Sequence, residues 1–531
     1  MARTTGTARA PAGRTVGGLI GLLSGAAAIG VSELAAGFIG GASSPILAVG
    51  STAIDATPEW LKSFAIREFG SHDKLALLIG IDMIMAIAAI VLGVLSIGRP
   101  RLGVIGLGVF GAIGVSASVT RPANGLVDAL PSIVGTAAGI GTYLLLRRRA
   151  GLTTPKEEKA AIRPAGGGRP EAAPAPGFDR RRFLGTGLAV AAIAGVTGEA
   201  GRFLVRRADA SASRAAVRIP TPLDEAPPTP AGADLGIPGL GPFITPNDQF
   251  YRVDTALFVP AVTAESWTLR VHGMVDREIV IDYAQLLARP LLERDVTLAC
   301  VSNEVGGRYI GNARWVGAPL KALLDEAGVA PGATQIVSRS SDGFTVGTPT
   351  ALAMDGRDSM LAVMMNGEPL PLEHGFPVRM LVPGLYGYVS ATKWLVDLEL
   401  TTFQAYDSYW VKRGWAQQAP IKTESRIDTP KPFATLRTGE VAVAGVAWAQ
   451  HRGIDRVEVR VDDGAWSTAE LGAEDTIDTW RQWVYRWSAA AGEHTLSVRA
   501  ADGTGAVQTP ARAAPFPNGA TGDHSIVVNV S

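Results

Sequence analysis

Five long, charge-poor segments occupy the first 205 residues, and they restrict the fold of this chain more than any other feature. Each reaches or approaches the roughly 20 residues that an α-helix needs to cross a lipid bilayer. The residues that follow have the composition of a globular protein. A helical membrane region followed by a soluble region is therefore expected. The five predicted spans are residues 16–39, 75–98, 102–120, 129–146 and 183–205.

Basic residues predict the orientation of these spans. With a cytoplasmic N-terminus, the inner segments contain fifteen Lys or Arg, namely three before the first span, two between the second and third, and ten from residue 147 to 182, whereas the outer loops contain four. Lys and Arg accumulate in short cytoplasmic loops. The sequence thus predicts that the fifth span leads outward and that the soluble region is extracytoplasmic.

The start of the fifth span resembles a twin-arginine export signal. Arg180 and Arg181 precede Phe183 and a mildly apolar run rich in Gly and Ala. An Arg cluster on the cytoplasmic flank of an ordinary span explains the same residues equally well. Residues 208–210, Ala-Asp-Ala, have the small side chains of a cleavage site, and cleavage there would separate the two halves of the chain.

Two acidic residues, Glu33 and Asp82, lie within predicted spans. Charged side chains are costly in a membrane and often mark function. Glu33 is near the outer end of its span and no basic partner is evident, so a functional role is the less favoured interpretation.

Composition also identifies linkers and excludes one class of function. Residues 151–177 are rich in Pro, Ala, Gly, Lys and Glu and predict a disordered loop, whereas the Pro-rich residues 219–242 predict a semi-extended tether. The formal net charge is zero, so nothing indicates nucleic-acid binding.

The chain contains a single cysteine, Cys300. It ends an apolar, strand-like run and precedes a polar, Gly-rich loop, so its sulfur is expected at a strand end. A lone thiol is either an inert core residue, which is more common, or a metal ligand or nucleophile. One cysteine excludes a cysteine-ligated iron–sulfur cluster and a Cys-x-x-Cys-His haem site, and His72 alone near the membrane region excludes a bis-histidine haem there.

The region around Cys300 predicts a mixed α+β domain at 241–405. Helices are expected at 282–288, capped by Asp282, and at 319–327, ended by Gly328. Expected strands include 267–275, 334–338, 362–365 and 378–382.

Four sequence blocks in this domain resemble a known family. They are residues 245–252 (TPNDQFYR), 298–315 with Cys300, 365–379 (MNGEPLPLEHGFPVR) and 383–394 (PGLYGYVSATKW), in that order. Together they resemble the molybdopterin-binding domain of the sulfite oxidase family. The resemblance implies two-electron oxygen-atom transfer at a molybdenum–molybdopterin cofactor.

The resemblance also implies roles for individual residues. Cys300 matches the thiolate ligand of molybdenum, Arg379 and Lys393 match positions that hold the pterin phosphate, and His374 matches a pterin contact. Each residue taken singly is better explained by an ordinary structural role: His374 as a turn cap, Arg379 as a surface strand residue and Lys393 as a snorkelling side chain. Tyr386 and Tyr388 are expected to hydrogen-bond the substrate or to pack over the pterin. The predicted catalytic residues are Cys300, Arg252 and Tyr386, and the predicted cofactor-binding residues are Asn247, Tyr251, Arg252, Cys300, Asn303, His374, Arg379 and Lys393.

One departure from the family concerns the substrate. Cations follow the ligand cysteine in animal and plant sulfite oxidases, whereas here Asn303 is followed by Glu304. A desolvated carboxylate would strongly repel a doubly charged oxyanion. This weakens sulfite as the predicted substrate, although Arg308 and Arg314 offer positive charge nearby.

In the C-terminal part, 406–531, the residues from about 420 onward predict short strands only. Alternating runs, with an Asp-Asp-Gly turn at 462–464, predict hairpins and an immunoglobulin-like sandwich of about seven strands. Residues 453–466 resemble the dimerisation domain that accompanies the molybdenum domain, which implies a homodimer. The alternating runs are 441–448, 455–461, 483–487 and 494–500.

The whole chain is thus predicted to be a multi-pass, membrane-anchored molybdopterin-dependent oxidoreductase. It would act on a small substrate and exchange electrons with a separate cytochrome or quinone-linked carrier. Two alternatives are a sulfoxide reductase of the methionine sulfoxide type and a non-enzymatic binding module with a vestigial molybdenum domain. The predicted parts are a four-helix transmembrane region (1–150), a linker, fifth helix and tether (151–240), the molybdopterin domain (241–405) and the sandwich (406–531).

Overall fold

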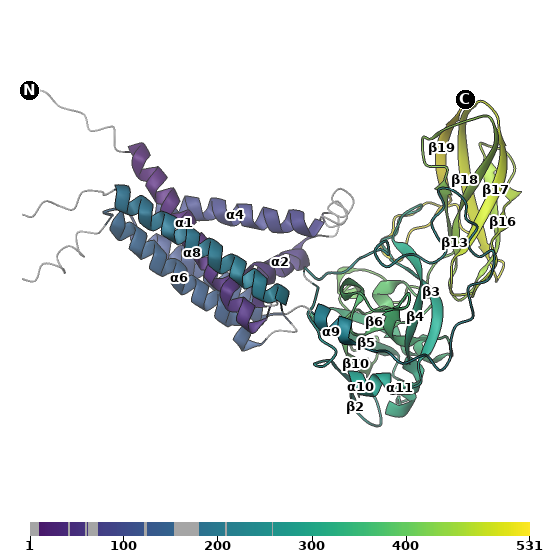
Figure 1. The fold of residues 1–531 in the computed structure, drawn as a ribbon, viewed down its shortest axis with the longest axis horizontal. Coiled ribbons are helices and arrows are strands. Elements are labelled where there is room, and N and C mark those ends of the chain that lie inside the picture. Colours follow the sequence, from purple (N-terminus) through teal and green to yellow (C-terminus); the bar gives the residue numbers. More distant parts are fainter. Residues whose placement is uncertain are drawn as a thin grey trace, which may run out of the picture. The chain divides into compact units, whose positions relative to one another are not determined.

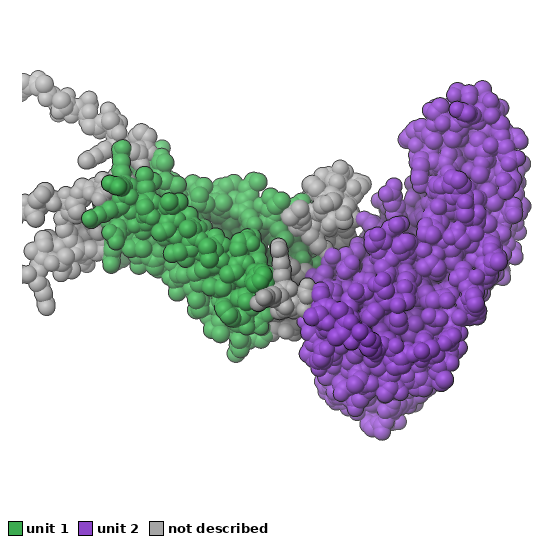
Figure 2. Space-filling model, in the orientation of Figure 1, with its two compact units in different colours: residues 1–209, 256–258 green, residues 210–255, 259–531 purple. Residues whose placement is uncertain are grey.

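A computed structural model describes residues 10–40, 43–58, 61, 73–121, 125–152, 180–207, 210–257 and 259–531. The chain divides into two compact units, coloured separately in Figure 2: residues 1–209 with 256–258, and residues 210–255 with 259–531. The predicted fold class is confirmed, with apolar helices first, then a mixed α/β domain, then β-sheets. The predicted disordered loop from residue 153 onward, His72 and two residues of the predicted cleavage site, 208 and 209, lie outside the described residues.

The first unit consists of helices (Figure 1). Among its described residues, five stretches are long and apolar enough to cross a membrane, and they coincide with the five predicted spans: Gly13–Ile39, Ala76–Leu95, Pro100–Val119, Leu126–Arg149 and Arg180–Leu204. The helices are α1 (Ala10–Ile39), α2 (Pro45–Ala56), α4 (Asp73–Leu95), α5 (Pro100–Val119), η3 (Leu126–Ala129), α6 (Leu130–Arg149) and α8 (Arg180–Arg207).

Helix α1 packs against α4, α6 and α8. Glycines permit the closest approach: a Cβ on Gly21 would lie 2.0 Å from the carbonyl oxygen of Ala89, and a Cβ on Gly93 would lie 2.2 Å from that of Gly17. Small residues at helix crossings are typical of membrane bundles, because they let backbones approach closely.

Helix α2 was not predicted. It begins with Pro45 directly after Ser44, a favoured helix start, but its 12 residues are too few to cross a bilayer. The Ser44 hydroxyl donates to the buried Glu33 carboxylate (2.6 Å), so the acid that lacked a partner in the sequence has a hydroxyl partner in the fold. Asp82, by contrast, is exposed on α4.

Two sheets organise the first part of the second unit: a mixed sheet of order β2-β1-β10-β5-β6, in which β1 and β10 are parallel, and an antiparallel sheet of order β3-β4-β7-β8, with β9 pairing with β7. The predicted helix ends are confirmed: Asp282 accepts from Gln285 N (2.7 Å) at the start of α10, and Gly328 ends α11 with φ +70°. The elements are α9 (Ser211–Ala216), β1 (Thr268–Gly273), β2 (Ile279–Asp282), α10 (Tyr283–Leu287), β3 (Leu292–Ala299), β4 (Ile310–Pro319), α11 (Leu320–Ala327), β5 (Gln335–Ser340), β6 (Thr345–Pro349), α12 (Thr350–Met354), β7 (Met360–Met365), β8 (Glu368–Pro369), η4 (Leu372–His374), β9 (Arg379–Leu381), η5 (Gly387–Val389), β10 (Leu395–Thr401) and η6 (Val411–Arg413).

Two further sheets form the C-terminal sandwich, with orders β11-β13-β17-β16 and β12-β19-β18-β14-β15. They share one core, to which Trp483, Val457 and Val498 belong. The predicted turn after β14 is present, and Gly464 N donates to Val461 O (3.0 Å). The strands are β11 (Glu424–Thr429), β12 (Thr435–Leu436), β13 (Gly439–Trp448), β14 (Ile454–Val461), β15 (Ser467–Thr468), β16 (Glu470–Leu471), β17 (Arg481–Ala489), β18 (Gly492–Asp502) and β19 (His524–Val530).

The predicted tether, 219–242, is extended but is not free. Asp224 pairs with the edge of β3, where Glu293 N donates to its carbonyl oxygen (2.8 Å), and Leu235 N donates to the side chain of Gln482 (2.8 Å). The semi-extended segment is thus held against the domain that it crosses, which satisfies backbone polar groups of the segment.

Candidate active site

Cys300 directly follows β3, as predicted. Its backbone N donates to Tyr309 O (2.9 Å), and its carbonyl accepts from Asn303 N (3.0 Å), so the loop 301–309 folds back on the strand end. The residue keeps part of its surface accessible, yet desolvation by the surrounding protein raises the pKa of its thiol. Such a thiol stays protonated at neutral pH until a metal displaces the proton.

Arg252, Arg379 and Lys393 bring three cations together from separate segments. Lys393 Nζ donates to Asp254 Oδ2 (2.8 Å) and to the Glu373 carbonyl (3.0 Å), and Arg252 Nε donates to the same Asp254 oxygen (2.9 Å). Burial nevertheless lowers the pKa of Lys393 to about 8. Because Asp254 supplies one negative charge against the three cations, this cation cluster keeps a net positive charge.

Arg379 is buried, with 5 % exposure. Its Nη1 donates to the His374 carbonyl (3.2 Å), and its guanidinium lies over the ring of Trp315, 5.1 Å from the centroid. Its Nε has no hydrogen-bond partner among the described residues, and burial lowers the pKa of Arg379 to about 10. A buried cation with an unused donor is arranged to receive an anion.

His374 is buried beside the cation cluster. Its Nε2 lies 3.2 Å from the Asn247 carbonyl oxygen, to which it can donate. Burial, reinforced by Arg379 and Lys393, lowers the pKa of His374 to about 3, so the ring is neutral. The side chain of Asn247 accepts from Asn366 (2.9 Å), which ties the first sequence block to the third.

Tyr251 links the thiol to the cations. Its ring stacks on Phe250, with centroids 5.2 Å apart. Burial raises the pKa of Tyr251, which is raised further by Cys300 when that thiol is ionised and lowered by Arg379, so its hydroxyl remains a hydrogen-bond donor. A Cβ on Gly387 would lie 3.9 Å from this hydroxyl, which places the 384–388 loop beside it.

The two tyrosines of the 384–388 loop differ in surroundings. Tyr386 is buried, and its pKa is raised mainly by burial, with contributions from the charges of Glu424 and Cys300. Tyr388 donates to the Ala416 carbonyl (2.6 Å) and packs against Trp415, whereas the Tyr386 hydroxyl is hydrogen-bonded to the backbone of Lys422.

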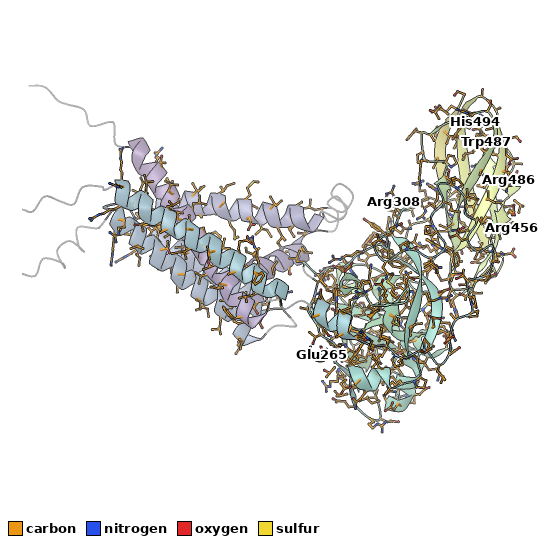
Figure 3. The ribbon with its side chains drawn as sticks, in the orientation of Figure 1. Glu265, Arg308, Arg456, Arg486, Trp487 and His494 are labelled. Atoms are coloured by element: carbon orange, nitrogen blue, oxygen red, sulfur yellow. The ribbon has the colours of Figure 1, made fainter. Side chains whose placement is uncertain are left out.

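The charges that follow Cys300 differ from expectation. Glu304 and Arg308 are exposed, and Figure 3 labels Arg308. Arg314 forms two hydrogen bonds with Asp295 (2.7 and 2.8 Å), so its charge is compensated away from the thiol. Water therefore screens the repulsion between Glu304 and an anionic substrate. The positive charge that the sequence offered at Arg314 is taken up by Asp295.

A cavity of about 330 Å³ adjoins the cation cluster. It is lined by Asn247 and Glu373, which contact His374 and Lys393, and by Arg214, which forms an ion pair with Glu368 (2.9 Å). Cys300 does not line it, so the cavity does not enclose the thiol.

The donor set fits a metal cofactor that carries an anionic tail. The thiol supplies a soft ligand, and the unused Arg379 Nε and the depressed pKa of Lys393 indicate incomplete charge compensation that an anion would complete. The side-chain nitrogen of the buried Asn303 also lacks a partner among the described residues, although its Oδ1 accepts from Tyr309 N (2.8 Å).

A family model described as "Oxidoreductase molybdopterin binding domain" matches residues 256–410. The chain carries a molybdopterin-binding domain of the sulfite oxidase family. This molybdopterin domain contains Cys300 and the segment from His374 to Lys393, and the first sequence block lies directly before it.

Similar proteins cover part of the chain. Mitochondrial sulfite oxidase of Homo sapiens is 31 % identical over 303 residues, which is 48 % of this chain and 55 % of that protein. Inducible nitrate reductase [NADH] 2 of Glycine max is 34 % identical over 218 residues, 36 % of this chain and 24 % of its own. The solved sulfane dehydrogenase SoxCD of Paracoccus pantotrophus has 25 % identity and a TM-score of 0.48, covering 55 % of this chain and 84 % of its own. The chain thus spans about half the length of the sulfite oxidases that it matches.

Sequence reasoning missed several residues of this site. Asp254 accepts hydrogen bonds from two cations, Arg252 and Lys393. It stands two positions after Arg252, so the sequence could have predicted this ion pair. Arg426 and His524, which contact the loop after Cys300, are too distant in sequence to give one.

Proposed function

We propose that this chain is a membrane-anchored, molybdopterin-dependent oxidoreductase that transfers an oxygen atom to or from a small substrate. The observation that carries the proposal is the convergence of the single thiol with the cation cluster, in which Arg379 and Lys393 are incompletely compensated, at a molybdopterin domain. When bound, the cofactor supplies two-electron redox chemistry that protein side chains lack.

Each site residue has a proposed role. Cys300 binds molybdenum as a thiolate, the form in which cysteine ligates metals. Arg379 and Lys393 bind the terminal phosphate, the first through its planar donors and the second as a point charge. Neutral His374 contacts the pterin. Asn247, Tyr251 and Asn303 complete the cofactor site.

Arg252 and Tyr386 are proposed to act on the substrate. Arg252 has a side chain that is 39 % exposed, against 10 % for Lys393, so it is the more accessible cation for an anionic substrate. Tyr386 keeps its proton at neutral pH because burial raises its pKa, and its hydroxyl would exchange the backbone of Lys422 for an oxygen atom near Cys300 as its hydrogen-bond partner.

A small sulfur oxyanion such as sulfite is the proposed substrate. The sequence-based objection was repulsion by a desolvated Glu304, but that residue is exposed. The names of the similar sulfite oxidases support the same class. Electrons would pass to a separate cytochrome or quinone-linked carrier.

The five apolar helices indicate a multi-pass membrane protein. We propose a cytoplasmic N-terminus, on the fifteen-to-four distribution of basic residues, and an extracytoplasmic catalytic domain. The arginines that begin α8 would then flank the last span on the cytoplasmic side or serve as an export signal. Alkaline phosphatase fused after Ser531 should be active, and an inactive fusion at normal expression contradicts this orientation.

Metal analysis and one activity assay test the proposed function. Full-length protein from a host that makes molybdopterin should contain molybdenum near one atom per chain, and Cys300→Ser should lose most of it. Wild type should reduce ferricyanide with sulfite. Absence of molybdenum from wild type contradicts the cofactor, undiminished molybdenum in Cys300→Ser contradicts the ligand, and sulfoxide-dependent oxidation of a reduced dye without sulfite activity contradicts the substrate class.

A further inference from the structure

The loop that follows Cys300 is held by residues far beyond the molybdopterin domain. Arg426, on β11, donates from Nη1 to the carbonyl oxygen of Gly307 (2.8 Å). Its other nitrogens pair with both carboxylate oxygens of Asp428 (2.7 and 3.1 Å), which fixes the guanidinium. The side chains of Arg426 and Asp428 are only 13 % and 15 % exposed, so this contact is largely shielded from water.

His524, the first residue of β19, contacts the same loop. A Cβ on Gly306 would lie 2.3 Å from its Nε2, and Gly306 has φ +77°. Glycine is therefore required at this position both for space and for backbone conformation. The His524 Nδ1 accepts from Ile427 N (3.0 Å), and burial lowers the pKa of His524 to about 4, so the ring is neutral and fixed in orientation.

The strand that leads to Cys300 is held from the same side. Thr297 N donates to Asp478 O (3.0 Å), the Thr297 carbonyl accepts from the side chain of Gln450 (3.0 Å), and its hydroxyl accepts from Trp480 N (2.7 Å). These hydrogen bonds satisfy the polar groups of Thr297 on the edge of β3 that does not pair with β4.

The second loop at the site is also fixed by later residues. Tyr386 N donates to Ala419 O, and Ile421 N donates to Gly384 O, each at 3.0 Å. Both loops that flank the thiol thus depend on residues after 410, where the family match ends.

We propose that the C-terminal sandwich is a structural part of the active site, in which Arg426 and His524 are positioning residues that hold the loop after Cys300. The inference rests on the proposed role of Cys300. It extends that role, because dimerisation alone would require no contact between the sandwich and this loop.

Hydrogen–deuterium exchange of the full-length protein in detergent tests the Arg426 contact without reference to substrate. Arg426→Ala should accelerate exchange of the 301–309 amides about tenfold or more, because a buried charge-assisted hydrogen bond is lost. Arg426→Lys should restore part of the protection, since an ammonium can still donate to Gly307 O. Exchange in β13 should not change. The matched control is Arg486→Ala, whose side chain is 62 % exposed on β17 (Figure 3).

Loop exchange equal to that of wild type in a folded Arg426→Ala protein overturns the proposal. So does a Lys variant that behaves as Ala does. Loss of molybdenum from wild type would contradict the proposed function and leave the exchange result intact, so the two failures are distinguishable.

A second pair of variants covers the case in which Arg426→Ala does not fold. Gly306→Ala should accelerate exchange of the loop, because the new methyl group meets the imidazole ring. Adding His524→Ala should reverse part of that acceleration. Independent, multiplicative effects of the two changes would show that the ring does not hold the loop and would overturn its assigned role.

Discussion

Arg379 combines deep burial with incomplete hydrogen bonding, which is costly for a cation without a ligand. Arg379 should therefore lower the free energy of unfolding of the cofactor-free protein and raise that of the loaded protein. The same reasoning applies to Lys393, although Asp254 offsets part of its charge.

Arg379→Met should stabilise the cofactor-free chain by about 1 to 3 kcal/mol, because an uncompensated buried charge is replaced by an apolar side chain of similar length. Cofactor content should fall about tenfold or more, since charge-assisted bonds to the phosphate are lost. Thermal unfolding of both forms and metal analysis measure these effects. Arg456→Met, on the sandwich surface, serves as control (Figure 3). Destabilisation of both forms would contradict the argument.

The lowered pKa of His374 leads us to expect a loss of stability in acid. Its pKa is about 3 in the folded protein, well below its ordinary value, so between these values the unfolded chain binds a proton that the folded chain does not. Stability therefore falls as pH falls, by about 2 kcal/mol between pH 7.5 and pH 5. His374→Gln should remove this part of the pH dependence.

The difference between wild type and His374→Gln isolates this histidine from other groups that titrate in the same range. Tryptophan fluorescence is a suitable probe, because all of the eleven tryptophans except Trp60 lie in the second unit. Parallel pH profiles of the two proteins would show that His374 is not the neutral, buried group described above.

At the scale of elements, short sequence patterns predicted where helices and strands end. Asp282 and Gly328 mark helix ends because capping depends on a few adjacent residues, and the change from apolar to glycine-rich sequence marked the end of β3. The ion pair of Lys393 with Asp254 and the bond of Arg426 to Gly307 join residues 139 and 119 positions apart. Such contacts depend on how sheets pack, which no short pattern encodes. Four family-specific blocks nevertheless allowed the site residues to be proposed from sequence.

The crossing of α1 and α4 predicts a contrast between two glycines. Gly21→Ala should destabilise the membrane bundle by about 1 to 3 kcal/mol, because the new methyl carbon would lie 2.0 Å from the Ala89 carbonyl oxygen. Gly141→Ala in α6 meets open space and should be neutral within the described part of the bundle. Resistance to unfolding in detergent, measured for both variants, checks the contrast, and equal values would contradict it.

At the scale of the whole molecule, the boundary between the molybdopterin domain and the sandwich is not a boundary between cores. Val446, Trp448 and Trp480 belong to the same buried cluster as Leu298 and Trp315. A chain that ends at residue 410 should therefore expose apolar surface and an uncovered strand edge.

Such a truncated chain should lose its molybdenum and be cleaved rapidly by protease within 292–309. Limited proteolysis followed by mass spectrometry locates the cleavage. A truncated protein that retains molybdenum and resists protease would show that the first part of the unit folds and binds the cofactor alone.

The bonds on the outer edge of β3 also set an order of events during synthesis. Thr297 leaves the ribosome 183 residues before Trp480, its hydrogen-bond partner, and His524 follows later still. At roughly 5 to 20 residues per second, the strand beside Cys300 waits about 10 to 40 seconds for its covering. Completion of the site around Cys300, and with it secure retention of a cofactor, can come only after His524 has left the ribosome.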